Sequence, residues 1–119
     1  MPEEFFKTGL SGTCLVVTFL IEEMKLYNSM DISNSIEEIL KKSSFKEIVL
    51  DLERVKFIDS SGIGSLVNIK KLAGRYGAEM IVACSNNDII EIINTTGIGR
   101  FFKIFPSAAD AEKYIREKV

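Results

Sequence analysis

Short apolar runs alternate with longer amphipathic segments along the chain. Two of the runs, 13–19 and 48–50, are rich in valine, leucine and isoleucine, as is typical of strands buried within a sheet. Further short strands are expected at 5–8, 80–83 and 101–105. Strand-like and helix-like segments that alternate in this way predict an α/β domain.

Two long amphipathic segments predict helices. Asn28 is a candidate N-cap for the first helix, with Asp31 in its first turn. The apolar residues of this segment recur at helical spacing on one face: Ile32, Ile36, Ile39 and Leu40. The second helix is expected over 61–76, and Gly77 ends it. Its buried stripe comprises Leu66, Ile69, Ala73 and Tyr76.

Two shorter helices complete the prediction. Asn87 is a candidate N-cap for a helix that ends at Gly97, and Ser107 with Asp110 three residues later indicates the start of the last helix. Ahead of the second long helix, three residues are expected to extend the buried chain: Val55, Phe57 and Ile58. Residues 1–119 should therefore form one domain with four or five strands and about four helices.

The composition excludes several kinds of chemistry. The 119 residues contain no histidine, which removes the Ser-His-Asp and Cys-His nucleophile systems and the usual zinc sites. Cys14 and Cys84 lie in apolar runs and are expected to be buried, reduced thiols. We expect no metal and no cofactor. A net charge of −2 does not favour binding to nucleic acid or a membrane, and we expect a cytoplasmic protein that is not an enzyme.

The most informative segment is the turn before the second long helix. An apolar run ends at Asp59, Ser60 and Ser61 follow, and Gly62 and Gly64 fall in the first helical turn. Helix capping alone is one interpretation, because Asp and Ser are both good N-caps. The other is an exposed serine that is modified, since a phosphoryl group there adds about −1.5 to −2 charges without breaking the core.

This segment resembles a known family. The run Phe57–Gly64 (FIDSSGIG), preceded by Ile48–Leu52 (IVLDL), closely resembles the signature of bacterial anti-sigma factor antagonists. These proteins are stand-alone STAS domains (sulphate transporter and anti-sigma factor antagonist). The likeness extends from about residue 13 to the C-terminus and implies a single STAS fold with a four- to five-stranded mixed sheet.

The resemblance implies a function. Such antagonists bind an anti-sigma factor that is also a serine kinase, and this binding releases a sigma factor. The kinase, which itself binds ATP, phosphorylates the serine that follows the aspartate, here Ser60, and a serine phosphatase reverses the modification. The residues implied to contact the partner are Asp59, Ser60, Ser61, Gly62, Ile63 and Gly64.

One segment departs from the family pattern. Where the family often has a Gly-x-Leu-Asp-like turn at the partner surface, this chain has Glu22-Glu23-Met24-Lys25. The local loop should therefore differ. Glu22, Glu23 and Lys25 are interface candidates, and solvated loop charges are the alternative interpretation.

Two other functions remain open. The chain could be an unswitched STAS scaffold or a ligand-sensing module within a signalling assembly. Alternatively, Asp51 ends an apolar strand as the phospho-acceptor of a receiver domain does, with Glu22 and Glu23 in place of the receiver's acidic pair.

Overall fold

A five-stranded mixed sheet forms the centre of the molecule. The computed structural model describes residues 5–118. The strand order is β1-β2-β4-β6-β7, and only the β1–β2 pair is antiparallel. The strands are β1 (Phe6–Ser11), β2 (Cys14–Phe19), β4 (Glu47–Asp51), β6 (Glu79–Ala83) and β7 (Lys103–Phe105).

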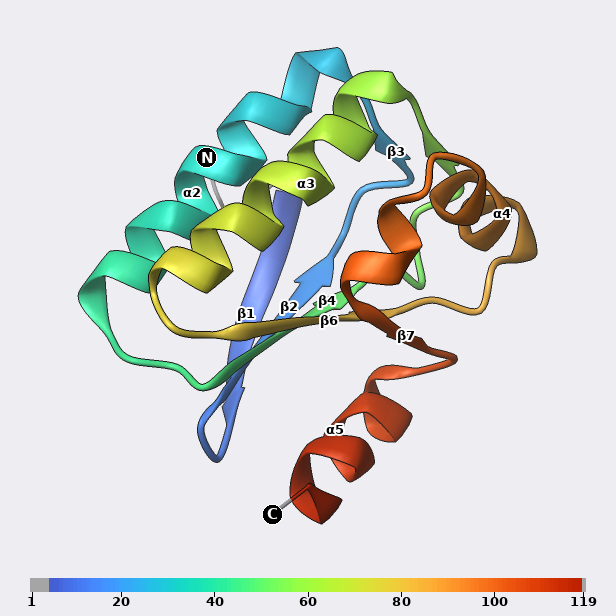
Figure 1. Cartoon of the computed structure of the whole chain (residues 1–119). Coiled ribbons are helices and arrows are strands. Elements are labelled where there is room, and N and C mark those ends of the chain that lie inside the picture. Colours follow the sequence, from blue (N-terminus) through green and yellow to red (C-terminus); the bar gives the residue numbers. More distant parts are fainter. Residues whose placement is uncertain (1–4, 119) are drawn as a thin grey trace.

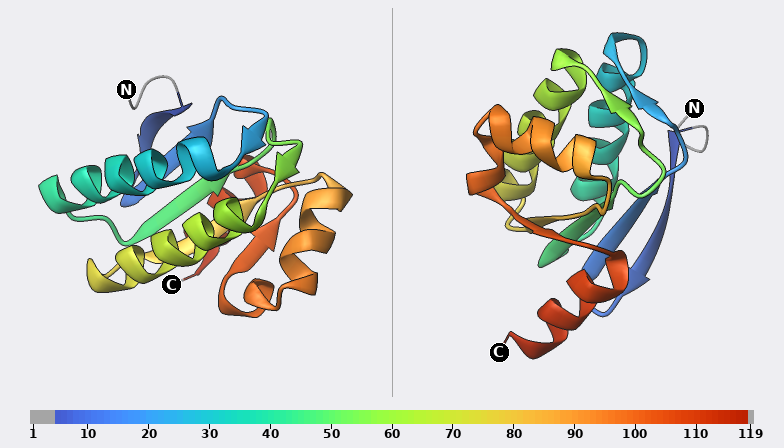
Figure 2. Two further views of the ribbon diagram at one scale, coloured as in Figure 1. Left: turned by 90° about the horizontal axis from the view of Figure 1, so that it is seen from above. Right: turned by 90° about the vertical axis from the view of Figure 1, so that its right-hand side faces the viewer.

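Helices cover both faces of this sheet, unequally. Figure 1 and Figure 2 show α2 (Leu26–Lys42), α3 (Ser60–Arg75) and α4 (Asn87–Thr95) on one face, and α5 (Ala108–Glu117) on the other. A 3₁₀ turn, η1 (Ile98–Phe101), follows α4 and leads into β7. The expected α/β fold, with four helices and a five-stranded mixed sheet, is confirmed. None of the described helices is long and apolar enough to span a membrane.

The two sheet faces support two apolar clusters, because successive strand residues point in opposite directions. On β2, Leu15 and Val17 belong to the large cluster under α2, α3 and α4. Cys14 belongs to the small cluster under α5, with Val49 and Ile81. Both thiols are free and buried, as expected, and burial raises the pKa of Cys14 to about 11.

Helices α2 and α3 lie side by side and run in the same direction, so that both begin at the same end of the molecule (Figures 1 and 2). Small polar residues line their contact. The Ser33 and Ser65 hydroxyls are 2.9 Å apart, and Ser65 Oγ donates to the Ser29 carbonyl at 3.1 Å. Short side chains at these positions let the two backbones approach closely, which fixes the relative position of the two helix N-termini.

Several sequence expectations are corrected by the structure. The first long helix begins at Leu26, and Asn28 is its third residue, whose Oδ1 accepts from Lys25 N at 3.0 Å. The N-cap of α4 is Asn86 instead of Asn87, with its side chain accepting from the first-turn amides. Phe57 is 46% exposed, whereas Val55 and Ile58 are buried.

The last two elements follow the sequence more closely. Residues 98–101 form the η1 turn, so the final strand begins two residues later than expected, at Lys103. Ser107 caps α5 by accepting from Asp110 N at 3.1 Å, as its spacing predicted.

Lys118 fastens the end of α5 to the sheet. Its Nζ lies 2.6 Å from Glu79 Oε1 on β6 and 3.4 Å from Glu47 Oε2 on β4. Tyr114 also donates to Glu79, at 3.2 Å. Burial raises the pKa of the Glu79 carboxyl. The hydrogen bond and the positive charge of Lys118 lower this pKa by more than burial raises it, so the pKa lies below its usual value.

The lowered pKa of Glu79 gives a pH dependence. The ion pair stabilises the fold at neutral pH, and this contribution is lost as the pH falls through the folded-state pKa of Glu79. Glu79→Gln should lower the free energy of unfolding in urea at pH 7 by about 0.2–1 kcal/mol, a small value because the side chain is partly exposed. The difference from the parent should vanish in acid, and Glu117→Gln, on the exposed side of α5, should show none at either pH.

Candidate functional site

The turn between β5 (Phe57–Ile58) and α3 places Asp59 as the N-cap of the helix. Its Oδ1 accepts a hydrogen bond from Gly62 N at 2.9 Å, and its backbone is extended. Ser60 is the first residue of α3 and is exposed, whereas Ser61 is half-buried. The capping interpretation therefore applies to Asp59. The Ser60 hydroxyl is left at the surface of the helix start.

Gly62 is where the helix meets a neighbouring backbone. A two-residue strand, β3 (Glu23–Met24), pairs in parallel with β5, and Asp59 N donates to Met24 O at 3.2 Å. A Cβ on Gly62 would overlap Met24 O and the Ile58 side chain. In contrast, a Cβ on Gly64 would meet no other atom within 4 Å. The two glycines of the motif therefore differ, since only the first is required by packing.

Residues 22–25, the segment that differs from the family pattern, lie directly beside this turn. Glu22 O accepts from Lys56 N at 2.7 Å and from Phe57 N at 3.1 Å. The Glu22 carboxylate also pairs with Lys56 Nζ at 3.2 Å. The structure thus brings the interface candidates of both segments to one end of the molecule, although more than thirty residues separate them along the chain.

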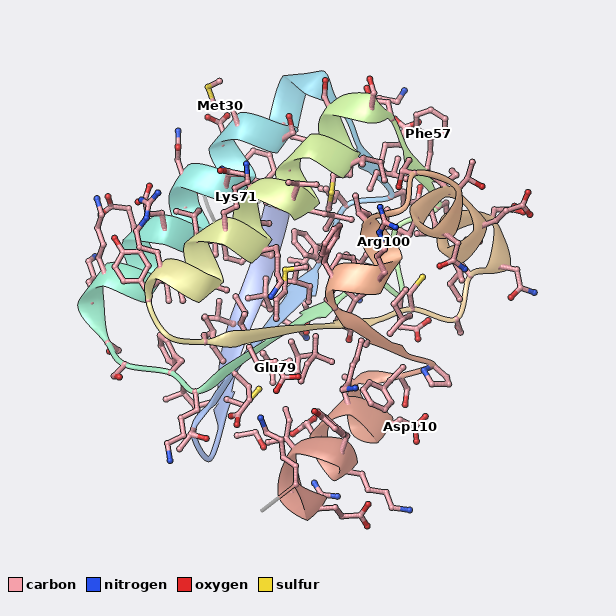
Figure 3. All side chains as sticks on the ribbon, viewed as in Figure 1. Met30, Phe57, Lys71, Glu79, Arg100 and Asp110 are labelled. Atoms are coloured by element: carbon pink, nitrogen blue, oxygen red, sulfur yellow. The ribbon has the colours of Figure 1, made fainter. Side chains whose placement is uncertain are left out.

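Two exposed apolar side chains at this end were missed by the sequence analysis. Phe57 is 46% exposed, and the Lys25 ammonium lies 5.0 Å from its ring centroid while pairing with Glu23 at 3.2 Å. Met30, in the second turn of α2, is 73% exposed. Figure 3 shows both at the end of the molecule where α2 and α3 begin. Phe57 and its neighbour Ile58 point in opposite directions on β5, but this strand is too short for the sequence to have shown the alternation.

The helix starts bring partial positive charge to this end, beside the carboxylates of Asp59, Glu22 and Glu23. The N-terminal amides of two parallel helices point towards it, and each helix contributes about half a positive charge there. Neither α2 nor α3 has an acidic residue in its first turn. A phosphoryl group on Ser60 would therefore lie close to helix amides as well as to the Asp59 carboxylate.

The receiver-like arrangement is not assembled. Asp51 ends β4, its Oδ1 accepts from Glu53 N at 3.1 Å, and burial raises its pKa. Glu22 and Glu23 pair with lysines at β3 and β5 instead. Within residues 5–118, no group of three or more acidic or cysteine residues is placed to hold a metal ion.

Comparison with known proteins decides the family, because the STAS domain model matches residues 8–111. The chain belongs to the STAS domain family. The resemblance carried by the Phe57–Gly64 segment is confirmed at this level, and the matched range contains β2 through the start of α5.

Several relatives of this STAS domain carry the words anti-sigma factor antagonist in their names. It is 25% identical over 97 residues to the "Anti-sigma F factor antagonist" of Paenibacillus polymyxa, covering 82% of this chain and 83% of that protein. Solved structures share the fold. An anti-sigma factor antagonist from Mycobacterium paratuberculosis has a TM-score of 0.74 at 21% identity, with 94% and 93% of the two chains covered. The phosphorylated form of the Bacillus cell fate determinant SpoIIAA has a TM-score of 0.66 at 19% identity, with 92% and 98% covered.

The close contact at Gly62 makes a stability prediction. Gly62→Ala should destabilise the STAS domain by about 1–3 kcal/mol, because the new methyl group forces α3 away from the Met24 backbone. Gly64→Ala is the matched control. It should leave stability unchanged or raise it by about 0.5–1 kcal/mol, because its position is open and alanine favours a helix. Urea unfolding of both variants gives the comparison, and equal losses would contradict the role assigned to Gly62.

Proposed function

We propose that this STAS domain is an anti-sigma factor antagonist whose binding to an anti-sigma factor serine kinase is switched off by phosphorylation of Ser60. The observation that carries the proposal is the exposed Ser60 hydroxyl at the first residue of α3, directly after the capping Asp59. The name of the Paenibacillus polymyxa relative supports the same function. The kinase would supply its own ATP, and a serine phosphatase would restore the active form.

The position of Ser60 suits a reversible switch. Asp59, rather than Ser60, satisfies the free amide of Gly62, so a modified serine leaves the helix cap intact. The added phosphoryl group contributes about −1.5 to −2 charges beside the Asp59 carboxylate. Phosphorylation would therefore change partner binding and leave the fold intact, since the modification changes the charge of the surface without entering the core.

The proposed docking surface joins two segments. It includes Asp59, Ser60, Ser61 and Gly64 at the start of α3, whereas the other two predicted contact residues, Gly62 and Ile63, are buried beneath it. The β3 segment with Glu22, Glu23 and Lys25 completes the surface, and backbone hydrogen bonds fix this segment beside the helix start. Met30 and Phe57 supply the exposed apolar area that a partner can bury. Because the loop charges differ from the family pattern, they would help to select this protein's own kinase from related ones.

Substitution of Ser60 tests the switch. With the purified anti-sigma factor kinase from the same cell, Ser60→Ala should take up no label from ATP and should bind the kinase within about twofold of the parent. Ser60→Asp should bind at least about tenfold more weakly, which is about 1.4 kcal/mol, because it places charge where the partner docks. Isothermal titration calorimetry and mass analysis of residues 57–76 measure the two effects.

A matched charge control is Ser44→Asp, on the exposed loop after α2, which should bind as the parent does. Kinase binding by Ser60→Asp as tight as that of the parent would disprove the switch. Label incorporated at another residue would disprove the choice of serine. Tight kinase binding with no labelling of Ser60 would instead indicate the unswitched scaffold.

A further inference from the structure

A second surface feature lies away from the docking end, between the outer side of α3 and the η1 turn. It is an apolar hollow of about 240 Å³. Figure 3 shows Lys71 on α3 and Arg100 on η1, the two elements that border it. The lining residues are Val67, Lys70, Lys71, Ile98, Phe101 and Phe102.

Phe101 is the unusual member of this lining. It is 59% exposed, one of the few large apolar side chains left at the surface of the described chain. The Arg100 guanidinium lies 5.4 Å from its ring centroid, so the aromatic wall stands beside a fixed positive charge. Exposing a phenylalanine to water is unfavourable, and a ligand that covers its ring would recover that cost.

A polar hollow of about 320 Å³ adjoins the apolar one. The two share Lys70, Phe101 and Phe102, and the polar hollow adds Arg100 and Lys103. Its carboxylate, Glu79, is already engaged by Lys118 and Tyr114. The apolar hollow thus shares three lining residues with a hollow that is bordered by basic side chains as well as by Glu79.

Three cations of this region form no ion pair with the protein. Within the part of the chain that the structure describes, none appears in a salt bridge: Lys70, Lys71 and Arg100. Lys103 differs, because its ammonium lies 5.6 Å from the Tyr114 ring centroid and its charge helps to lower the pKa of Glu79. The whole chain carries a net charge of −2, so this local excess of positive charge runs against the overall balance. Such a patch attracts a small anion and disfavours a cation.

We propose that this pair of hollows binds a medium-chain carboxylate, with the hydrocarbon tail against Val67, Ile98 and Phe101 and the carboxylate among Lys70, Lys71 and Arg100. The volume of the apolar hollow corresponds to about eight waters at ~30 Å³ each, and a hydrocarbon tail of about the same volume would fill it. The site is separate from the docking end around Ser60, and the proposal does not depend on the antagonist function.

A small ligand fits this surface better than a protein segment does. Lysine is depleted at the cores of protein interfaces, where its ammonium loses hydration, and here lysines line the apolar hollow itself. A stable protein interface buries about 800 Å² on each partner. The outer face of α3 beside the hollow carries exposed Asn68, Lys71 and Arg75 instead of a broad apolar area.

Titration with octanoate, followed by ¹H–¹⁵N NMR of the intact protein, tests the proposal. Octanoate should shift the amides of 67–71 and 98–103 saturably, with a dissociation constant of about 0.1–1 mM, the range expected for a ligand of about ten heavy atoms. Acetate has the charge without the tail, and octylammonium has the tail with the opposite charge. Each of these probes should bind at least about tenfold more weakly.

Variants locate the site. Phe101→Ala should weaken octanoate binding at least about tenfold. The double variant Lys70→Gln/Lys71→Gln should weaken octanoate binding at least about fivefold, and both variants should otherwise give amide spectra like that of the parent. Lys42→Gln, in the last turn of α2, is the matched control and should change nothing. The proposal is overturned if no saturable shift occurs up to about 10 mM. Acetate or octylammonium binding as well as octanoate, or unchanged affinity in Phe101→Ala, would also overturn it.

Discussion

The contact between Gly62 and the Met24 backbone is the constraint on which the functional end depends. Because no side chain intervenes, the first turn of α3 rests directly on β3, and the Asp59 amide completes the β3–β5 pairing. This single close approach fixes the position of the helix start, the exposure of Ser60 and the neighbouring charged loop. The hydroxyl-lined contact between α2 and α3 extends the same constraint along both helices, through Ser33 and Ser65.

Local sequence patterns predicted the elements better than their boundaries. The second long helix was expected at its observed place within one residue, because apolar residues recur over four turns and Gly77, with φ of 78°, can end it. Capping was harder to predict. Asn28 resembles an N-cap but reaches back to Lys25 from inside the helix, and Asn86 and Asn87 are adjacent and chemically equal.

The candidate site was predictable only in part, for a physical reason. The roles of Asp59 and Ser60 can be predicted from local turn chemistry. In contrast, Glu22 and Lys56 come into contact only because two segments that are distant in the sequence pair as parallel strands. No local pattern encodes such a pairing, and a two-residue strand is too short to show periodicity. Phe57 was expected to be buried because it lies in an apolar run, yet alternation within β5 turns it outward and Ile58 inward.

The placement of α5 has a practical consequence. This helix lies on the far face of the sheet from α2 and α3, fastened there by Lys118 (Figure 2). A fluorescent dye or an affinity handle joined to an exposed side chain of α5, such as Lys113, would therefore stand clear of the surface around Ser60. Immobilising the protein by that route presents the serine end to solution, which is the orientation that sensor-chip measurements require.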